Sequence, residues 1–305
     1  MKKYRFLPAV FLLAATFGSA QTLDPVLGIS TLQLWTAGAP EVAGTSPDDL
    51  PTLTVFVPQK GRSTGSAVIV APGGSYLGLA SNLEGRQVAD WFTARGITAF
   101  ALKYRLGAKY LYPIPLQDAQ RAVRLVRSLA AADGFSPDRI GFVGFSAGGH
   151  LAAATGTLFD AGKPDAVDPV ERLSDRPDFL VLGYPWLNAM QPSGHYITYC
   201  SRIPSIPPET CKLDDEKYTP SRHVTRQTPT TFIYSTTDDE TVPISASVDF
   251  YNALIAASVA AELHIFRHGD HGSGLGAGSA ALDLWPVLLE QWLRDQGLLT
   301  PLPKP

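Results

Sequence analysis

The pentapeptide GFSAG at residues 144–148 places a serine in a G-x-S-x-G pattern. A β-rich run, residues 139–145, leads into Ser146, and a run of small residues typical of a helix, 147–157, follows it. A nucleophilic serine needs this setting, because a sharp strand-to-helix turn exposes its hydroxyl group. The free N–H groups at the start of such a helix stabilise negative charge on an oxygen atom. We therefore expect Ser146 to act as a nucleophile, with Ala147 as one oxyanion donor; an inert glycine-rich turn is the alternative.

A serine hydroxyl is a poor nucleophile without a base, and histidine is the usual one. His271 is the favoured base, because it follows the predicted strand 262–266 and precedes a glycine-rich loop that can bring its imidazole over the sheet edge. His268 is the competing base. His264 falls within the strand and is expected to be a packed side chain. His150, four residues after the serine, is expected to be a buried and hydrogen-bonded helix residue.

The imidazole in turn needs an acid that holds its tautomer and stabilises its cation. Asp238 and Asp239 follow the predicted strand 230–234, so both face the edge of the sheet that carries the serine. The spacing D-x-x-V-P selects Asp239 as the acid, and Asp238 is the alternative. Ser146, Asp239 and His271 then follow one another in the order of the α/β-hydrolases.

A second oxyanion donor is expected in the turn that follows the buried run 67–71 (AVIVA). Glycine allows a backbone to approach a ligand closely, so the N–H group of Gly74 or Ser75 can complete the oxyanion hole. Tyr76 in this turn, and Trp186 beyond a later strand, are candidate substrate-binding residues that could stack on a sugar ring. The alternative for both aromatic residues is simple packing.

The elements that position these residues alternate between strands and helices. Strands are expected at 52–57, 67–71, 97–102, 139–145, 179–183, 230–234 and 262–266, and helices at 82–95, 116–131, 147–157, 244–257 and 281–295. This alternation predicts a mostly parallel central sheet with helices on both faces. Trp285 and Trp292 are expected in the core. Arg121, Arg124 and Arg127 lie mostly off the apolar face of their helix and are expected at a solvated surface.

The ends and the insertion of the chain carry further expectations. Residues 1–20 combine a basic start, a short apolar run and small residues before Gln21, which is the layout of a signal peptide and predicts export to the periplasm or beyond the cell. Residues 21–305 then form one domain. The stretch 186–227 is expected to be a lid-like insertion over the active edge. Within it, Cys200 and Cys211 would meet an oxidising compartment and could form a disulfide.

Composition excludes several classes of function. The chain has 305 residues, with 25 basic and 28 acidic side chains and a net charge of −3, so no positive field favours nucleic acid. No later stretch resembles a membrane span. The spacing of His264, His268 and His271 could suggest a metal, but a strand followed by a loop presents no common face. We therefore expect no metal, no cofactor and no stable membrane anchor.

The chain resembles the α/β-hydrolase superfamily, and within it the bacterial esterase and lipase branch with members similar to acetyl esterases and feruloyl esterases. The resemblance is carried by VIVAPGGSYLGLA, YPIPLQDAQRAVRLVR, DRIGFVGFSAGGHLAA, TTDDETVP and AELHIFRHGDHGSGLG. It implies Ser146 as nucleophile, Asp239 as acid and His271 as base, with Gly74, Ser75 and Ala147 near the oxyanion. Two positions depart from the family. PGGS replaces the HGGG of related lipases. The final histidine is usually flanked by glycine and an aromatic residue, whereas here Asp270 precedes it and Gly272 and Ser273 follow.

These observations predict an exported serine carboxylesterase that forms an acyl-enzyme. The resemblance favours acetyl or feruloyl esters of plant carbohydrates, so the expected partner is a small-molecule or oligosaccharide ester. Two alternatives stay open. One is a serine peptidase of the same fold, although such peptidases usually carry a large extra domain. The other is a carbohydrate-binding protein that has lost catalysis, against which all three triad positions argue.

Overall fold

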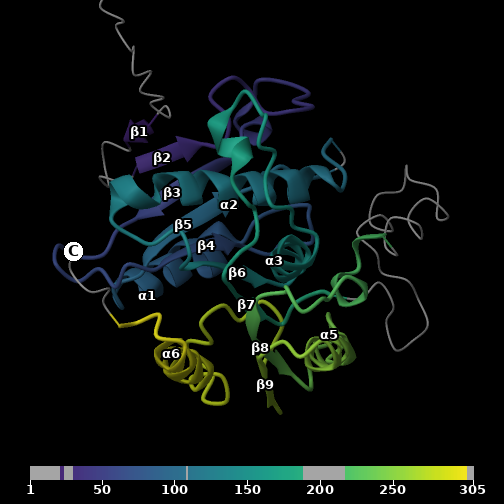
Figure 1. Ribbon diagram of the computed structural model, residues 1–305. Helices are drawn as coiled ribbons and strands as arrows, with labels where there is room; N and C mark the ends of the chain where they lie inside the picture. Colours follow the sequence, from purple (N-terminus) through teal and green to yellow (C-terminus); the bar gives the residue numbers. More distant parts are fainter. Residues whose placement is uncertain (1–20, 24–29, 108, 188–216, 301–305) are drawn as a thin grey trace, which may run out of the picture.

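The computed structural model describes residues 21–23, 30–107, 109–187 and 217–300 (Figure 1). They form one nine-stranded sheet in the order β1-β2-β3-β5-β4-β6-β7-β8-β9. The strands are β1 (Gln21–Leu23), β2 (Ser30–Gln33), β3 (Thr52–Phe56), β4 (Ala67–Ala71), β5 (Thr98–Lys103), β6 (Ile140–Phe145), β7 (Phe179–Gly183), β8 (Thr230–Thr236) and β9 (Ala261–Phe266). From β5 to β9 every neighbouring pair is parallel, whereas β1, β2 and β3 are antiparallel. The predicted mostly parallel sheet is confirmed, and the short strands β1 and β2 were not predicted.

Five α-helices accompany the sheet in the described part of the chain. They are α1 (Gln87–Thr93), α2 (Ile114–Asp133), α3 (Ala147–Thr157), α5 (Ser245–Ala256) and α6 (Trp285–Asp295). The helix expected at 82–95 consists of a wider turn, η2 (Ser81–Arg86), that continues into α1. The last helix starts at Trp285 rather than at 281. Pro286 accounts for this start, because proline fits the first turn of a helix, where its missing N–H group is not needed.

The two faces of the sheet are covered by different helices. Along β4, Ala67, Ile69 and Ala71 pack into one apolar cluster, and Val68 and Val70 pack into another, as the alternation of side chains along a strand requires. The first cluster includes residues of α2, α3 and α5, and the second includes residues of α1 and α6, so the sheet lies between two helical layers (Figure 1). Trp285 and Trp292 belong to the second cluster and are buried, as predicted.

The arginines of α2 do not lie at a solvated surface. The side chains of Arg121 and Arg124 are only 5% exposed and that of Arg127 is 11% exposed. Their carboxylate partners are Asp160, Asp168, Glu171, Asp175 and Asp178. The expectation of exposure was wrong because the segment between α3 and β7, with its short helix η3 (Pro169–Arg172), packs against α2. Burial of an arginine is tolerated when each charge finds an opposite one.

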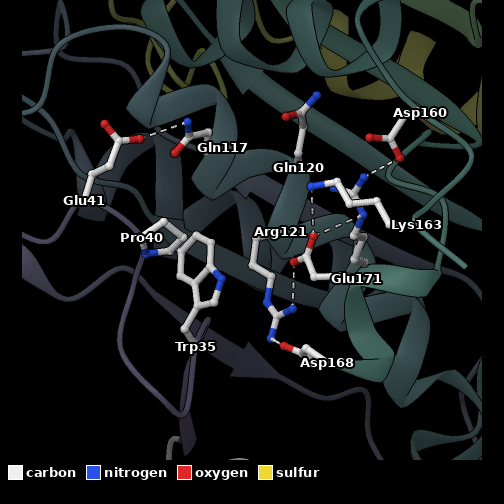
Figure 2. Close-up of a pocket in the computed structure, with 11 residues that line it drawn as sticks. Trp35, Pro40, Glu41, Gln117, Gln120, Arg121, Asp160, Lys163, Asp168 and Glu171 are labelled. Carbon is white, nitrogen blue, oxygen red and sulfur yellow. Dashed lines mark hydrogen bonds and ion pairs between the residues drawn. The ribbon is translucent and has the colours of Figure 1, made fainter. Parts of the chain in front are cut away.

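A hollow of about 470 Å³ lies beside α2 and η3 (Figure 2). The cations on its wall are already paired: Arg121 Nη1 lies 2.8 Å from Glu171 Oε1, and Arg124 Nη2 lies 2.5 Å from Asp160 Oδ1 (Figure 2). None of the predicted catalytic residues lines this hollow. We therefore regard it as a surface recess braced by ion pairs and separate from the chemistry of Ser146.

Several predictions concern residues that the structure does not describe. The predicted signal peptide at 1–20 and both cysteines, Cys200 and Cys211, lie outside the described residues. Of the predicted insertion 186–227, the structure describes only 186–187 and 217–227, which include the short helix η5 (Pro220–Arg222). These predictions stay untested. Among the helices that the structure does describe, none combines the length and the apolar character that crossing a bilayer requires.

Candidate active site

The five strands β4, β6, β7, β8 and β9 run parallel, so their carboxyl ends meet at one edge of the sheet. Each of these ends leads into a segment with polar or reactive side chains. The turn after β4 holds the predicted oxyanion loop, Ser146 follows β6, and Tyr184 follows β7. Asp239 and His271 follow β8 and β9 within a few residues. The topology therefore gathers the predicted catalytic residues at one place, as is usual for open parallel sheets.

Ser146 occupies a strained turn between β6 and α3. Its φ of 51° and ψ of −118° lie in a region that L-residues rarely adopt. Two neighbouring glycines make the turn possible. A Cβ atom on Gly144 would collide with the carbonyl oxygen of Gly148, and a Cβ atom on Gly148 would collide with the carbonyl oxygen of Ala71. The G-x-S-x-G pattern is therefore a steric requirement of this turn, which holds the serine at the start of α3.

A chain of hydrogen bonds connects the three predicted catalytic side chains. His271 Nε2 lies 2.8 Å from Ser146 Oγ, and His271 Nδ1 lies 2.7 Å from Asp239 Oδ2. Asp239 Oδ1 accepts the N–H groups of Thr241 at 2.8 Å and Val242 at 2.9 Å, which fixes the carboxylate. Because the carboxylate only accepts, Nδ1 of a neutral imidazole carries the proton, and Nε2 can accept the proton of the serine. This geometry can generate a serine alkoxide.

The alternative residues form a separate pair at the surface. Asp238 Oδ2 lies 2.8 Å from His268 Nδ1, and Asp238 Oδ1 accepts the N–H group of Gly269. Both side chains are about half or more exposed, and the hydrogen bond to His268 lowers the pKa of Asp238. His264 lies instead beside Glu262, with 3.1 Å between their polar atoms. The three clustered histidines therefore contact three different acids, and the structure joins His271 to Asp239.

The predicted oxyanion loop packs directly against the serine. A Cβ atom on Gly73 would lie 2.9 Å from Ser146 Cβ, and Gly74 has a φ of 137° that favours glycine. Ala147 is the first residue of α3, where N–H groups have no partner within the helix. In the part of the chain described here, no backbone acceptor is assigned to the N–H groups of Gly74 and Ala147. Gly73 thus lies against Ser146 and Ala147 follows this serine at the start of α3, while the roles of Gly74, Ser75 and Ala147 as oxyanion donors stay predictions.

The two aromatic residues predicted to bind substrate differ in their surroundings. Tyr76 is only 1% exposed, and its hydroxyl group lies 2.7 Å from His150 Nδ1. Its ring has no open face for a sugar, so the expectation for Tyr76 is corrected: the turn after β4 folds inward and packs this ring against Tyr104 and Tyr112. Trp186 is partly buried, and its backbone N–H group donates to the carbonyl oxygen of Ser146. Its contact with substrate stays a prediction.

His150 is a hydrogen-bonded helix residue, as predicted, but its surface is partly rather than fully buried. The carbonyl oxygen of Tyr218 lies 3.1 Å from His150 Nε2, which must therefore be the donor, and Nδ1 accepts from the hydroxyl group of Tyr76. Burial lowers the pKa of His150 to about 4. A neutral histidine therefore links the turn after β4 to the segment before η5.

The partly buried His150 predicts a loss of stability in mild acid. In the unfolded chain a histidine binds a proton near pH 6.5, whereas in the folded protein it resists protonation down to about pH 4. The free energy of unfolding is therefore highest above pH 6.5. It falls by roughly 2 to 3 kcal/mol as the pH drops from 6.5 toward 4. Chemical denaturation at pH 7.5 and pH 4.5 measures it. His150→Gln keeps a donor and an acceptor but does not titrate, so it should show a weaker pH dependence; an equal dependence would contradict the assignment.

Two buried residues at the site were not predicted. Glu84 in η2 accepts the N–H group of Gly73 at 2.6 Å and the hydroxyl group of Tyr184 at 2.7 Å. The ring of Tyr184 meets the ring of His271 edge to face, with 5.0 Å between the centroids. The sequence offers only weak indications of these roles: an acid near the start of a predicted helix, and an aromatic residue directly after a strand. Neither pattern distinguishes a site residue from a packing residue.

Known proteins share this fold. The chain matches the family model for the alpha/beta hydrolase fold over residues 68–273. It is 30% identical over 255 residues to an acetylxylan esterase of Xylanibacter ruminicola, which covers 83% of this chain and 48% of that protein. The crystal structure of an acetyl ester-xyloside bifunctional hydrolase from Caldicellulosiruptor lactoaceticus is 36% identical, with a TM-score of 0.79 and coverage of 88% of this chain and 96% of that one. The butyrate-bound esterase 2 of Thermogutta terrifontis is 26% identical, with a TM-score of 0.67 and coverage of 83% and 92%.

The chain matches only part of the length of its curated relatives. The chain spans about half the length of that acetylxylan esterase, and 32% of the length of the endo-1,4-beta-xylanase B of Butyrivibrio fibrisolvens, to which it is 31% identical over 211 residues. The family match runs from β4 to just beyond His271 and so includes the strand ends that carry Ser146 and Asp239. The chain therefore belongs to the α/β-hydrolase fold family.

Proposed function

We propose that the protein is an esterase that removes acetyl groups from xylan-derived oligosaccharides. The observation that carries this proposal is the continuous hydrogen-bonded chain from Ser146 through His271 to Asp239 beside a glycine loop. Two relatives support the substrate class, because one is an acetylxylan esterase and the other an acetyl ester-xyloside hydrolase. Feruloyl esters of the same carbohydrates are the second candidate substrate.

The reaction would begin at Ser146. His271 Nε2 accepts the hydroxyl proton while Oγ attacks the ester carbonyl carbon. The carbonyl oxygen becomes negative and is stabilised by N–H groups of Gly74 or Ser75 and of Ala147 at the start of α3. Asp239, held by two backbone N–H groups, stabilises the imidazolium that forms.

The acyl-enzyme then forms and is hydrolysed. The tetrahedral intermediate collapses as the bond to the alcohol oxygen breaks, and His271 donates its new proton to that leaving alcohol. A water molecule enters, gives a proton to His271 and attacks the acetyl carbon on Ser146. The second intermediate releases acetate and returns the proton to Ser146 Oγ. His271 thus carries one proton in each half of the reaction: from Ser146 to the leaving alcohol in the first, and from water to Ser146 in the second.

A panel of substrates tests the proposal. Acetylated xylo-oligosaccharides, feruloylated arabinose, p-nitrophenyl acetate, p-nitrophenyl butyrate and a chromogenic peptide would be compared by kcat/KM. We expect acetylated xylo-oligosaccharides to exceed feruloylated arabinose by at least about tenfold, a discrimination that a shaped acyl pocket can supply. Preference for the feruloyl ester would transfer the proposal to the second candidate. Cleavage of the peptide alone would contradict an esterase.

We also propose that the protein is exported, because residues 1–20 have the layout of a signal peptide. Expression with the full N-terminus, followed by fractionation of the cells and intact-mass measurement, tests this proposal. The expected product begins at Gln21 and is found outside the cytoplasm. A product that retains Met1 and stays in the cytoplasm would contradict export.

A further inference from the structure

Glu84 is a buried carboxylate that touches two loops of the active site. It is 3% exposed and lies in η2, directly beyond the turn that holds Gly74 and Ser75. Its Oε2 accepts the N–H group of Gly73 at 2.6 Å, and its Oε1 accepts the hydroxyl group of Tyr184 at 2.7 Å. Both oxygen atoms are therefore used, each by a donor from a different strand end.

Tyr184 extends this connection to the loop of the catalytic histidine. Its hydroxyl oxygen accepts the N–H group of Gly274 at 2.8 Å, three residues beyond His271. Its ring packs against the imidazole of His271, and its backbone φ of 33° is unusual for a residue other than glycine. Burial and the nearby Tyr234 and Glu84 hold the pKa of Tyr184 well above its usual range, so its hydroxyl group remains a donor to Glu84.

The burial of Glu84 is costly. Among the ion pairs of the described residues none includes Glu84, so its carboxylate is held by neutral donors alone. A buried charge without an opposite charge destabilises a fold, and an apolar residue of similar size is the usual alternative. Packing therefore does not explain the carboxylate. The two hydrogen bonds that it accepts, from Gly73 and Tyr184, explain why a carboxylate stands here.

The hydrogen bond between Glu84 and Gly73 fixes the start of the predicted oxyanion loop. The N–H group of Gly73 donates to Glu84 and therefore cannot itself act as an oxyanion donor; the N–H group of Gly74 follows it directly in the same turn. Gly73 packs closely beside the nucleophile, since a Cβ atom there would lie 2.7 Å from the carbonyl oxygen of Phe145 and 2.9 Å from Ser146 Cβ. The orientation of the Gly73 peptide thus sets where the following N–H groups point.

We propose that Glu84 is a positioning residue for the esterase reaction: it orients the oxyanion loop through Gly73 and holds the loop of His271 through Tyr184 and Gly274. The inference rests on the proposed function of Ser146. Glu84 touches neither the serine nor the imidazole, so its effect comes from geometry. Displacement of catalytic groups by about 1 Å can lower a rate by about 100-fold.

Three variants and one matched control test this role. Glu84→Ala removes both acceptors, and Glu84→Gln keeps one acceptor oxygen. Tyr184→Phe removes the hydrogen bonds to Glu84 and to Gly274 but leaves the one between Glu84 and Gly73. Tyr234→Phe is the control, because Tyr234 also donates a buried hydroxyl group to Gly274, at its carbonyl oxygen, without contacting Glu84 by a hydrogen bond. Each tyrosine variant thus removes one buried hydroxyl group that contacts Gly274 in the loop of His271.

The expected results separate positioning from simple stability. With p-nitrophenyl acetate, Glu84→Ala should lose about 100-fold in kcat, and Glu84→Gln and Tyr184→Phe about tenfold each, with KM changed less than about threefold. The inhibition constant of phenylboronic acid, which mimics the tetrahedral intermediate, should rise by similar factors. Tyr234→Phe should lower the melting temperature but change kcat less than about threefold.

Several outcomes would overturn the proposal. They are kinetics of Glu84→Gln and Tyr184→Phe within threefold of the wild type, a loss confined to KM, or an equal loss of kcat in Tyr234→Phe. Both glutamine and phenylalanine variants conserve side-chain volume, so the test does not depend on the alanine variant being folded. The wild type provides the separate check of function: if it hydrolyses no ester, the proposed function fails, whereas active wild type with unaffected variants refutes only the role of Glu84.

Discussion

Ser146→Ala is expected to lose at least about 10⁴-fold in kcat for ester hydrolysis while it stays folded. Without Oγ no acyl-enzyme can form, and the remaining oxyanion donors provide only a small rate enhancement. The backbone of residue 146 makes bonds that alanine keeps: its N–H group donates to Gly183 and its carbonyl oxygen accepts from Trp186. The variant should therefore melt within a few degrees of the wild type.

The measurement combines kinetics with mass spectrometry. Turnover of p-nitrophenyl acetate and the thermal melt would be recorded for both proteins, and each would be treated with a fluorophosphonate. The wild type should gain one adduct on Ser146, and the variant none. Ser245→Ala, at the exposed start of α5, is the matched control and should keep full activity and labelling. Retained turnover in Ser146→Ala, or an adduct on another residue, would contradict the assignment of the nucleophile.

Asp239→Asn is expected to lower kcat by about 10³- to 10⁴-fold through the wrong tautomer of the imidazole. Oδ1 of Asp239 accepts the N–H groups of Thr241 and Val242, so an asparagine must direct its carbonyl oxygen there. Its NH₂ group then faces His271 Nδ1, which has to become an acceptor. The proton moves to Nε2, and the imidazole can no longer accept the proton of Ser146.

Asp238→Asn is the control for this experiment. Its neighbour His268 is exposed and lies outside the hydrogen-bonded chain to the serine, so the variant should keep kcat within about threefold. Side-by-side measurement of kcat and KM for the two variants decides which aspartate acts on the base. A large loss in Asp238→Asn with little change in Asp239→Asn would mean that the two loops rearrange in solution.

Much of the fold could be predicted because buried strands and their helices have distinct patterns. The apolar run AVIVA corresponds to β4 residue for residue, since a strand covered on both faces must be apolar throughout. The arginines of α2 show the limit of this reasoning. The sequence places them off the apolar face, but it does not show that a segment about 50 residues later supplies carboxylates and covers Arg121 and Arg124.

For the site, local patterns identified the groups that carry the chemistry. The sequence by itself determined the strand-to-helix turn at Ser146, because only glycine fits at position 144, where a Cβ atom would collide with the carbonyl oxygen of Gly148. It also placed an acid and a histidine at the ends of β8 and β9. These features depend on residues close together in the chain, whose backbone geometry follows from their own side chains.

The tertiary structure alone decided which partners meet. It joined His271 to Asp239 and His268 to Asp238, buried Tyr76 instead of exposing it, and brought Glu84 between two loops. Neighbouring aspartates have the same local pattern, and a lone glutamate has no pattern that reveals its partner. Hydrogen bonds between segments roughly 30 to 125 residues apart depend on how the sheet twists and how the loops pack, which no local spacing encodes.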